Sequence, residues 1–271
     1  MAAMSVTEKR EALRCLTKVA RYARKQIEDA GRQGTILDLR EHKGHDESSI
    51  DRDAQSAIIG LLHRHFPAFR GMVVFEDGRA ELFGNEGVGT EKFVLTIDEI
   101  DGTTNMKRAL ASSFIFPVSA SLSFALGTTE RLGDVEVSVV HALDTGEIFS
   151  AIRMDGGDYL AFVDGRLLYP VDIVESRGDS NARVLVPGYS FKVRGYKAGV
   201  EEALIRHGLK RVYEGSRSSS MDIIGIIRNL NDGYVDARAL FGDEHEYGAM
   251  LQGYDVAGVI PIALGVGLRV E

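Results

Sequence analysis

Cysteine, a basic charge excess and long apolar runs are all scarce in this 271-residue sequence, and each scarcity excludes a class of protein. Cys15 is the single cysteine, so an intramolecular disulfide is impossible and nothing indicates an oxidising compartment. The formal net charge of −8 argues against nucleic acid as the main partner, because binding a polyanion needs a basic face. No apolar run could span a bilayer, and charged residues soon follow Met4 in place of a secretory segment. We therefore expect a cytoplasmic protein that binds neither nucleic acid nor membrane.

The periodicity of the sequence changes near residue 170. Before it, a capping box at Ser5 predicts one helix, and a second is expected over 51–65. Period-two segments joined at glycines between 118 and 154 then predict an antiparallel sheet. After it, strands and helices alternate. We expect an α+β part over 1–170 that carries metal-binding motifs, and an α/β part over 171–271 that adds further ligands and substrate contacts.

The remaining local predictions concern shorter segments. Strands are expected at 72–75, 93–97, 183–186, 209–213 and 234–237, helices at 198–207 and 218–230, and loops at 42–49 and 80–91.

The run from Asp98 to Asn105, Asp-Glu-Ile-Asp-Gly-Thr-Thr-Asn, is the most informative motif. It follows an apolar strand, and its carboxylates are oxygen ligands of the kind that a hard cation prefers. Gly102 allows the backbone to turn closely under an anion, and the hydroxyl-bearing residues then begin a helix whose free N–H groups can bind phosphate. The motif predicts a seat for a phosphate ester held by divalent metal.

Three motifs in chain order resemble those of the inositol monophosphatase superfamily, a group of magnesium-dependent, lithium-sensitive phosphatases. They are Phe75-Glu76-Asp77, the Asp98–Asn105 run, and Tyr254-Asp255-Val256-Ala257-Gly258. The resemblance extends from the helix at Asp51 to the helix at Asp255. It implies the layered αβαβα sandwich of the inositol monophosphatase and fructose-1,6-bisphosphatase type, an α/β (α+β) fold, and a homodimer.

Carried over position by position, the resemblance implies two or three Mg²⁺ per active site. Glu76, Asp98 and the Ile100 carbonyl would hold one ion, and Asp98, Asp101 and Asp255 a second. Thr103, paired with Asp51 and beside Glu76, would orient the attacking water. The N–H groups of Gly102 and Thr103 would bind phosphate, and Asp236 would bind substrate hydroxyls. Ser216, Ser218, Ser219 and Ser220 lack a Gly-x-Ser-x-Gly elbow, so they are expected to begin a helix, and we include Ser219 among the substrate contacts.

The sequence also departs from the family pattern. Glu99 replaces the usual proline, Asp77 a second glutamate and Tyr254 a tryptophan, and the chain stops soon after Gly267. These changes concern substrate identity and oligomer contacts more than metal binding. The direction of the Glu99 carboxylate does not follow from the sequence.

Several other residues can be explained by a structural role alone, without a catalytic or metal-binding function. Asp51, Asp98 and Asp101 could each be only a helix cap, and Asp236 only a turn residue. His42 and His45 lack a third well-spaced ligand, so no zinc site is expected. The pairs Lys107–Arg108 and Lys192–Arg194 are either solvated or hold a second substrate phosphate.

The expected function is Mg²⁺-dependent hydrolysis of a small phosphate monoester. Inositol monophosphate or a related polyol or sugar phosphate is the preferred candidate substrate. A fructose-1,6-bisphosphatase or a dual-specificity phosphatase is the alternative within this class. A non-catalytic metal- or phosphosugar-binding protein is the alternative outside it.

Overall fold

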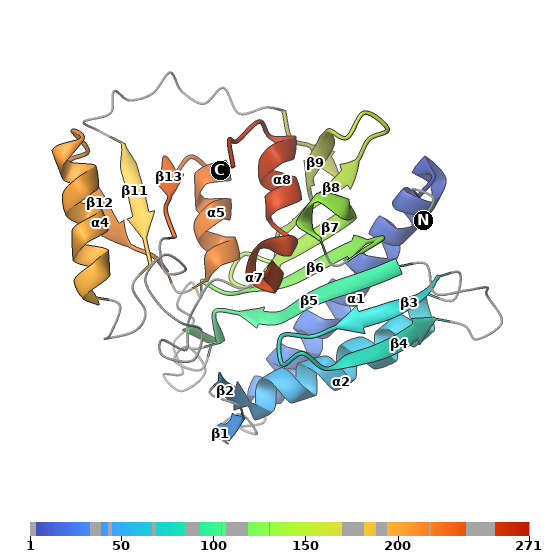
Figure 1. Ribbon diagram of the computed structural model, residues 1–271. Helices are drawn as coiled ribbons and strands as arrows, with labels where there is room; N and C mark the ends of the chain where they lie inside the picture. Colours follow the sequence, from blue (N-terminus) through green and yellow to red (C-terminus); the bar gives the residue numbers. More distant parts are fainter. Residues whose placement is uncertain are drawn as a thin grey trace.

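The protein, seen in a computed structural model, is a stack of helical and sheet layers (Figure 1). The structure describes residues 4–32, 39–42, 45–66, 69–84, 93–103, 105–106, 119–129, 131–169, 182–187, 194–216, 218–236 and 253–270. Within these ranges, only the backbone is described for residues 30–53, 194 and 196.

An eight-stranded sheet forms the centre, with the order β10-β9-β8-β7-β6-β5-β3-β4. Neighbouring strands are antiparallel except β3 and β5, which are parallel. The strands are β3 (Arg70–Val74), β4 (Ala80–Gly84), β5 (Phe93–Asp101), β6 (Ser121–Gly127), β7 (Val135–Ala142), β8 (Ile148–Arg153), β9 (Tyr159–Val163) and β10 (Arg166–Leu167). A short 3₁₀ turn, η1 (Leu132–Asp134), precedes β7.

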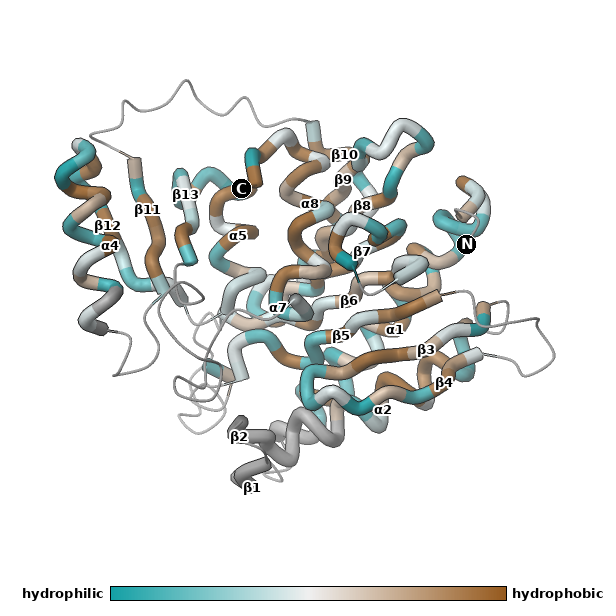
Figure 2. Tube along the Cα trace, in the orientation of Figure 1, coloured by the Kyte–Doolittle hydropathy of each residue, from teal (hydrophilic) through white to brown (hydrophobic). Residues whose placement is uncertain are grey.

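Both faces of this sheet are covered, so its middle strands are buried along their whole length. Every residue of β6 and β7 is buried. Along β6, Leu122 and Phe124 belong to the larger core on one face, whereas Ala125 packs in a small cluster with Ala257. Figure 2 shows the hydrophobic residues gathered on these strands and on the helices that flank them. The alternation follows from the period of two along a strand.

Helices α1 (Val6–Arg32) and α2 (Ser49–His65) pack against each other and cover one face of the sheet (Figure 1). The expected capping box is confirmed, because Ser5 N–H donates to Glu8 Oε2 over 2.7 Å and Glu8 N–H donates to Ser5 Oγ over 3.3 Å. Ile58 and Leu62 are fully buried, as the helical spacing predicted. A two-stranded hairpin, β1 (Leu39–His42) and β2 (His45–Ser48), leads into α2.

The other face is covered by the C-terminal helices α5 (Ser219–Ile227), α7 (Gly253–Ala257) and α8 (Ile260–Gly265). Beyond α5 lies a parallel three-stranded sheet in the order β12-β11-β13, with α4 (Arg194–Arg206) outside it (Figure 1). Its strands are β11 (Arg183–Val186), β12 (Arg211–Glu214) and β13 (Gly233–Tyr234). The layers therefore run helix, sheet, helix, sheet, helix, which confirms the expected αβαβα sandwich.

Two expected loops are partly strands. Residues 42–49 fall largely in the β1–β2 hairpin, and residues 80–84 form β4, which pairs with β3. Both segments are rich in charged or small residues, so their sequence carries little strand signal, and pairing with a neighbour decides their conformation. The expected strand at 234–237 is shorter, since β13 spans only two residues.

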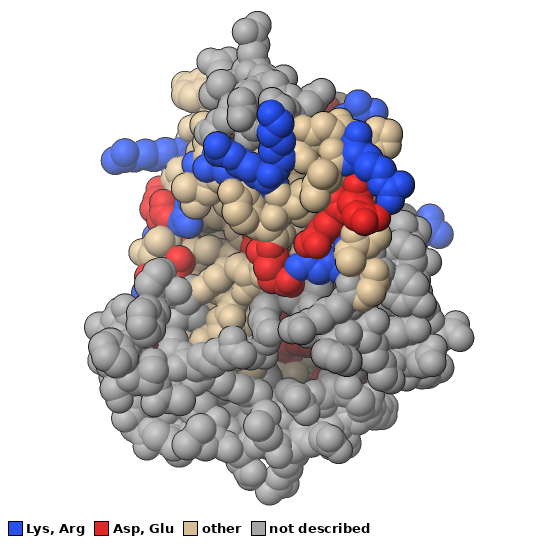
Figure 3. Space-filling view, turned by 90° about the vertical axis from the view of Figure 1, so that its left-hand side faces the viewer, with Lys and Arg blue, Asp and Glu red and all other residues tan. Residues whose placement is uncertain are grey.

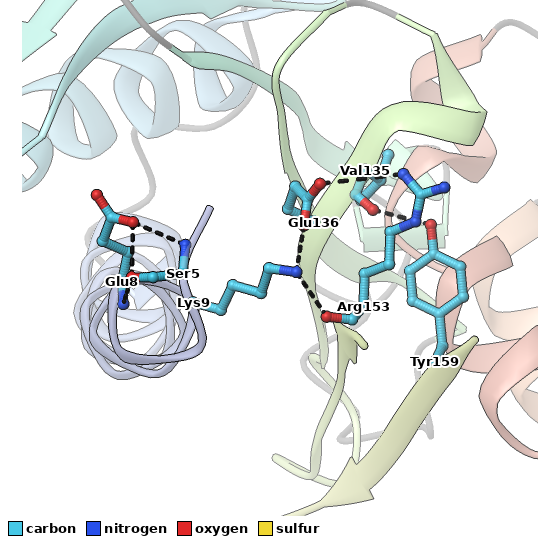
Figure 4. Close-up of polar contacts among 7 residues, drawn as sticks. All are labelled: Ser5, Glu8, Lys9, Val135, Glu136, Arg153 and Tyr159. Atoms are coloured by element: carbon cyan, nitrogen blue, oxygen red, sulfur yellow. Dashed lines mark hydrogen bonds and ion pairs between the residues drawn. The ribbon is translucent and has the colours of Figure 1, made fainter. Parts of the chain in front are cut away.

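A buried ion pair fastens α1 to the sheet (Figure 4). Lys9 Nζ lies 2.6 Å from Glu136 Oε2, and their side chains are 3% and 5% exposed. Lys9 also donates to the Arg153 carbonyl oxygen over 2.8 Å, and the Arg153 guanidinium lies 3.9 Å from Glu136. The charge on Glu136 is therefore compensated from two elements, which a buried carboxylate requires.

The face that carries α4 and β12 mixes Lys and Arg with Asp and Glu (Figure 3). Lys197 pairs with Glu214, and Arg206 with Glu202, on this face. The described part of this face therefore carries charges of both signs and is not uniformly basic. None of the helices that the structure describes is long and apolar enough to cross a bilayer.

Candidate active site

Glu76 and Asp98 lie side by side because β3 and β5 are parallel. Val74 pairs with Thr96, and extending this register by two residues places Glu76 beside Asp98. Glu76 stands in the tight turn between β3 and β4, where Phe75 N–H bonds the Arg79 carbonyl oxygen and Gly78 adopts φ +77°. The turn therefore delivers a carboxylate to the end of β5.

An irregularity in β5 brings its acids to one face. Asp98 pairs with Ser123 and Asp101 with Ser121, so three steps along β5 match two along β6. Directly opposed residues share a face of a sheet, and Ser121 and Ser123 share one face because they are two apart. In a regular strand the spacing of three would send Asp98 and Asp101 to opposite faces. The bulge therefore turns both toward the side of α7.

Glu76, Asp98 and Glu99 offer carboxylate oxygens that all lie within 4.8 Å of one another. Asp98 and Glu99 are 2% and 1% exposed. Oδ1 of Asp98 is buried and has no hydrogen-bond partner among the residues that the structure describes. Two like charges at such a separation repel by ~3 kcal/mol at an effective dielectric constant of about 20. The arrangement is one that a cation would stabilise.

Asp101 is held by the first turn of α5. Its Oδ2 accepts hydrogen bonds from Ser218 Oγ at 2.9 Å and Ser220 N–H at 2.7 Å, and its Oδ1 accepts one from Ser219 N–H at 3.2 Å. Ser218 also caps the helix, since its side chain accepts from the Met221 N–H. A carboxylate at a helix N-terminus is favoured by the free N–H groups and the helix dipole. Asp101 thus joins β5 to the C-terminal half of the chain.

Asp255 reaches the same place from α7, which packs on β5 and β6. Ser220 Oγ donates to the Asp255 carbonyl oxygen over 3.0 Å, so α5 fixes α7 directly. Gly258 allows the close approach to β6, because a Cβ there would collide with Ser123 Oγ.

Acid–base equilibria reflect this crowding of carboxylates. Burial, and then the charges of Asp101, Glu76, Asp255 and Glu99, raise the pKa of Asp98 well above its usual value. Burial and the Asp255 charge raise the pKa of Asp101 to about 7, although its hydrogen bonds from α5 oppose the shift. Burial, and then the charges of Glu76, Asp255, Asp98 and Glu99, raise the pKa of Tyr254. Acids from three separate segments, the β3–β4 turn, β5 and α7, thus share one electrostatic environment.

The backbone turns sharply after Asp101 and begins a helical turn at Thr103. Gly102 has φ +93°, and a Cβ there would collide with the Ser119 carbonyl oxygen, so glycine is required. The Gly102 carbonyl oxygen accepts from Asn105 N–H at 2.9 Å, which closes the turn. Asn105 Nδ2 donates to the carbonyl oxygens of Ser119 at 2.7 Å and Ser216 at 2.5 Å. The motif asparagine therefore ties the turn to both halves of the fold.

Solved structures share this architecture at low sequence identity. Extragenic suppressor protein suhB from Bartonella henselae has a TM-score of 0.67 and 18% identity, and the match covers 94% of this chain and 85% of that one. The IMPase of Thermotoga maritima has a TM-score of 0.62 and 21% identity, covering 93% and 81%. A structure described as an inositol monophosphatase-fructose 1,6 bisphosphatase has a TM-score of 0.62 and 16% identity, covering 97% and 84%. No family sequence model matches the chain, and no curated protein sequence does.

This chain has the inositol monophosphatase fold. The expected fold is therefore confirmed by its neighbours as well as by its layers. At these identities the likeness concerns the fold, and the chemistry has to be argued from the side chains of the site.

The donor set in this inositol monophosphatase fold fits Mg²⁺. The ion prefers oxygen ligands and keeps some of its water, so clustered carboxylates with room for further ligands are appropriate. The buried Oδ1 of Asp98, which lacks a hydrogen-bond partner in the described part of the chain, would suit such an ion as a ligand atom. The Ile100 carbonyl oxygen accepts a hydrogen bond from Thr103 Oγ1 at 2.8 Å, and a carbonyl oxygen has a second lone pair with which it could bind a metal.

The expected substrate contacts lie next to Asp101. Ser219 donates its N–H to Asp101, and its hydroxyl lies 3.2 Å from the hydroxyl of Tyr234. The Tyr234 hydroxyl donates to Asp236 Oδ2 over 3.0 Å. A continuous polar chain thus runs from the carboxylate cluster to Asp236.

Other residues named from the sequence either have side chains that the structure does not describe or lie away from the cluster. Asp51 lies in the first turn of α2, and its side chain is outside the described residues, as are the side chains of the Lys107–Arg108 and Lys192–Arg194 pairs and of His42 and His45. Asp77 is exposed, and its carboxylate accepts the Arg79 N–H over 2.8 Å, so it shapes the turn and stays out of the cluster.

Sequence reasoning missed three features of the site. It gave no direction for Glu99, which the bulge brings into the cluster. The serines begin α5 as expected, but the sequence did not show that Ser218, Ser219 and Ser220 all donate to Asp101. It gave no role to Tyr234, although a tyrosine two residues from an expected substrate-binding aspartate was a signal that could have been used.

Proposed function

We propose that this chain is a Mg²⁺-dependent phosphomonoesterase that hydrolyses a small polyol or sugar phosphate, with inositol monophosphate as the first candidate. The carboxylate cluster of Glu76, Asp98 and Glu99, with ligand oxygens within 4.8 Å, carries the proposal. Asp101 and Asp255 extend it from the neighbouring elements. Such a concentration of buried acid repels a phosphate ester unless cations intervene, so the site itself argues for metal.

In this proposal Glu76, Asp98, the Ile100 carbonyl, Asp101 and Asp255 hold the ions. Bound Mg²⁺ would neutralise the carboxylates, attract the phosphate and favour ionisation of a water. Two or three ions per site are expected. Phosphoryl transfer depends on positioning and charge neutralisation more than on covalent help, which suits a site built from carboxylates and N–H groups.

The chain's own residues would position the reactants. The N–H groups of Gly102 and Thr103 begin the helical turn and would bind phosphate oxygens. The Thr103 hydroxyl donates to the Ile100 carbonyl, so its oxygen can accept a hydrogen bond from the attacking water. Asp51 and Glu76 would orient the same water. Asp236 and Ser219 would bind substrate hydroxyls, and the hydrogen bond between Tyr234 and Asp236 supports this role.

A fructose-1,6-bisphosphatase is the second candidate, because a structure described as an inositol monophosphatase-fructose 1,6 bisphosphatase shares the fold over 97% of this chain. A non-catalytic metal- or phosphosugar-binding protein is the candidate of another class. A homodimer and a cytoplasmic location remain part of the proposal.

Phosphate release from a panel of esters, with Mg²⁺ and with chelator, tests the proposal. Release from inositol monophosphate that depends on Mg²⁺ is the expected result, and release from fructose 1,6-bisphosphate instead favours the second candidate. Metal binding without turnover of any ester favours the binding protein. Inhibition by lithium would support the inositol assignment, and insensitivity would weaken that assignment alone.

A further inference from the structure

The bulge of β5 places two consecutive acids, Asp98 and Glu99, in one cluster. Neighbouring residues of a regular strand point to opposite faces of the sheet. Here the carboxylates of both lie with Glu76 within 4.8 Å. The irregular register between Asp98 and Asp101 is the local feature that accounts for this.

Burial makes this arrangement significant. Glu99 is 1% exposed and Asp98 is 2% exposed, so neither charge is solvated by bulk water. Asp98 contributes a carboxylate oxygen to the cluster, and its Oδ1 is buried and finds no hydrogen-bond donor among the described residues. A buried carboxylate oxygen normally has a donor or a metal as its partner. The unpartnered oxygen is therefore an observation that points to a cation independently of the number of acids.

Two buried hydroxyl groups lie opposite the acids of β5. Ser123 pairs with Asp98 across the strands, and Ser121 pairs with Asp101. Both hydroxyls are buried, and neither has a hydrogen-bond partner in the described part of the chain. Hydroxyl groups beside such a site could exchange hydrogen bonds with water that is bound to a cation.

We propose that Glu99 is a metal ligand, and that it completes a three-carboxylate site for a divalent cation with Glu76 and Asp98. This inference rests on the proposed metal-dependent function and names a ligand beyond the set assigned above. The third carboxylate gives the site one more negative charge, and this strengthens cation binding.

Binding of Mn²⁺, followed by the loss of its free-ion electron paramagnetic resonance signal, tests the assignment without reference to activity. Glu99→Gln keeps the shape of the side chain and removes its charge. It should raise the Kd for Mn²⁺ by about tenfold or more. Glu76→Gln and Asp98→Asn should do the same. Asp77→Asn is the matched control, because Asp77 follows Glu76 directly but is exposed and bonded within its turn.

Thermal unfolding separates a ligand from a structural residue. Without metal, Glu99→Gln should melt at the wild-type temperature or above it, since one repelling charge is removed, and its stabilisation by Mn²⁺ should be smaller. An unchanged Kd for Mn²⁺ in Glu99→Gln, with binding lost in Glu76→Gln, would overturn the inference and leave the proposed function standing. Tight binding that depends on Glu99 but no ester hydrolysis would support the inference while refuting the proposed function. If Glu99→Gln does not fold, Glu99→Asp, which keeps the charge on a shorter arm, should fold and bind more weakly; wild-type affinity in it would also overturn the inference.

Discussion

Ser220 donates its backbone N–H to Oδ2 of Asp101 over 2.7 Å, although 119 positions separate them in the chain. With the bonds from Ser218 and Ser219, this contact makes one carboxylate both a candidate metal ligand and the cap of α5. The candidate active site is therefore also a joint between the two sheets.

On the proposed function, Asp101→Asn should lower activity by at least about a hundredfold, because a proposed metal ligand is lost and a new N–H₂ group faces the donors of α5. The same change should destabilise the fold by about 1–2 kcal/mol, since a carboxylate cap is weakened. Phosphate release and urea unfolding measure the two effects. Asp232→Asn is the control, because Asp232 also accepts a backbone N–H, from Arg183 at 2.7 Å, at the far end of α5. Equal activity in both variants would contradict the role.

Gly258→Ala should displace α7 from β6 and raise the Kd for metal, because its Cβ would collide with Ser123 Oγ. We expect a loss of about 1–3 kcal/mol in stability from the overpacking. The double variant Ser123→Ala/Gly258→Ala should recover most of the lost stability and metal affinity, since it removes the Ser123 Oγ atom with which the new Cβ collides. Calorimetric titration with Mn²⁺ and thermal unfolding test this, and a double variant no better than Gly258→Ala would count against it.

On the proposed function, Tyr234→Phe should raise KM several-fold and leave kcat nearly unchanged, because its hydroxyl donates to Asp236, a proposed substrate contact. Tyr213→Phe is a suitable control, since Tyr213 is 47% exposed on β12. Steady-state kinetics on the preferred ester decide the matter. Identical KM values in the wild type and Tyr234→Phe would show that the tyrosine does not position Asp236.

Lys9→Met should cost about 3 kcal/mol in stability, because it leaves Glu136 buried with only the distant Arg153 guanidinium. Lys9→Met combined with Glu136→Leu should cost clearly less than the two single changes together. Urea unfolding of the four proteins completes the cycle. The exposed pair Arg206 and Glu202, at 75% and 70% exposure, should give a coupling below about 1 kcal/mol. Strictly additive effects at Lys9 and Glu136 would refute the pairing.

His141 should lower the stability of the protein in mild acid, whereas Asp98 and Asp101, whose pKa values are raised in the fold, act in the opposite direction. The ring nitrogens of His141 lie 3.2 Å from the carbonyl oxygens of Ala20 and Gly146. Burial lowers the pKa of His141 below 6.5, and this outweighs those contacts; Arg24 and Arg21 lower it further. His141 therefore binds a proton more tightly in the unfolded chain than in the folded one. Its contribution to the stability of the fold is fully present above pH 6.5 and declines as the pH falls below that value.

Urea unfolding of the wild type and of His141→Gln at about pH 7.5 and about pH 5.5 isolates the contribution of His141. On going from the higher to the lower pH, the stability of His141→Gln should change more favourably than that of the wild type, and the stability of His207→Gln, at an exposed position, should change as in the wild type. Parallel behaviour of the wild type and His141→Gln would exclude His141 as the cause.

The sequence predicted those parts of the fold that have a strong local signal. The helical spacing in α2, the apolar composition of α5, the capping box at Ser5 and the apolar or alternating pattern of strands β5 to β8 are all local signals. Strand β4 and the β1–β2 hairpin were not predicted, because their conformation depends on a partner strand. The division of the chain near residue 170 stays a prediction.

The candidate site was predictable as a set of residue types but not as a geometry. Asp98, Asp101 and Gly102 stand in one motif, so their proximity follows from the chain itself. The place of Glu99 depends on the bulge opposite Ser123, and the grip of α5 on Asp101 depends on tertiary packing. No local pattern encodes either contact. The roles of Asp51, Thr103 and the other site residues stay proposals.

The extra residue in β5 also makes this strand sensitive to changes in length. Loss of Ile100 would restore an even pleat, and Glu99, then the single residue between Asp98 and Asp101, would face the hydrophobic layer beneath α1 and α2. Such a deletion would harm the protein more than replacing any one of those side chains, and libraries of one-codon deletions should be depleted there before anywhere else on the strand.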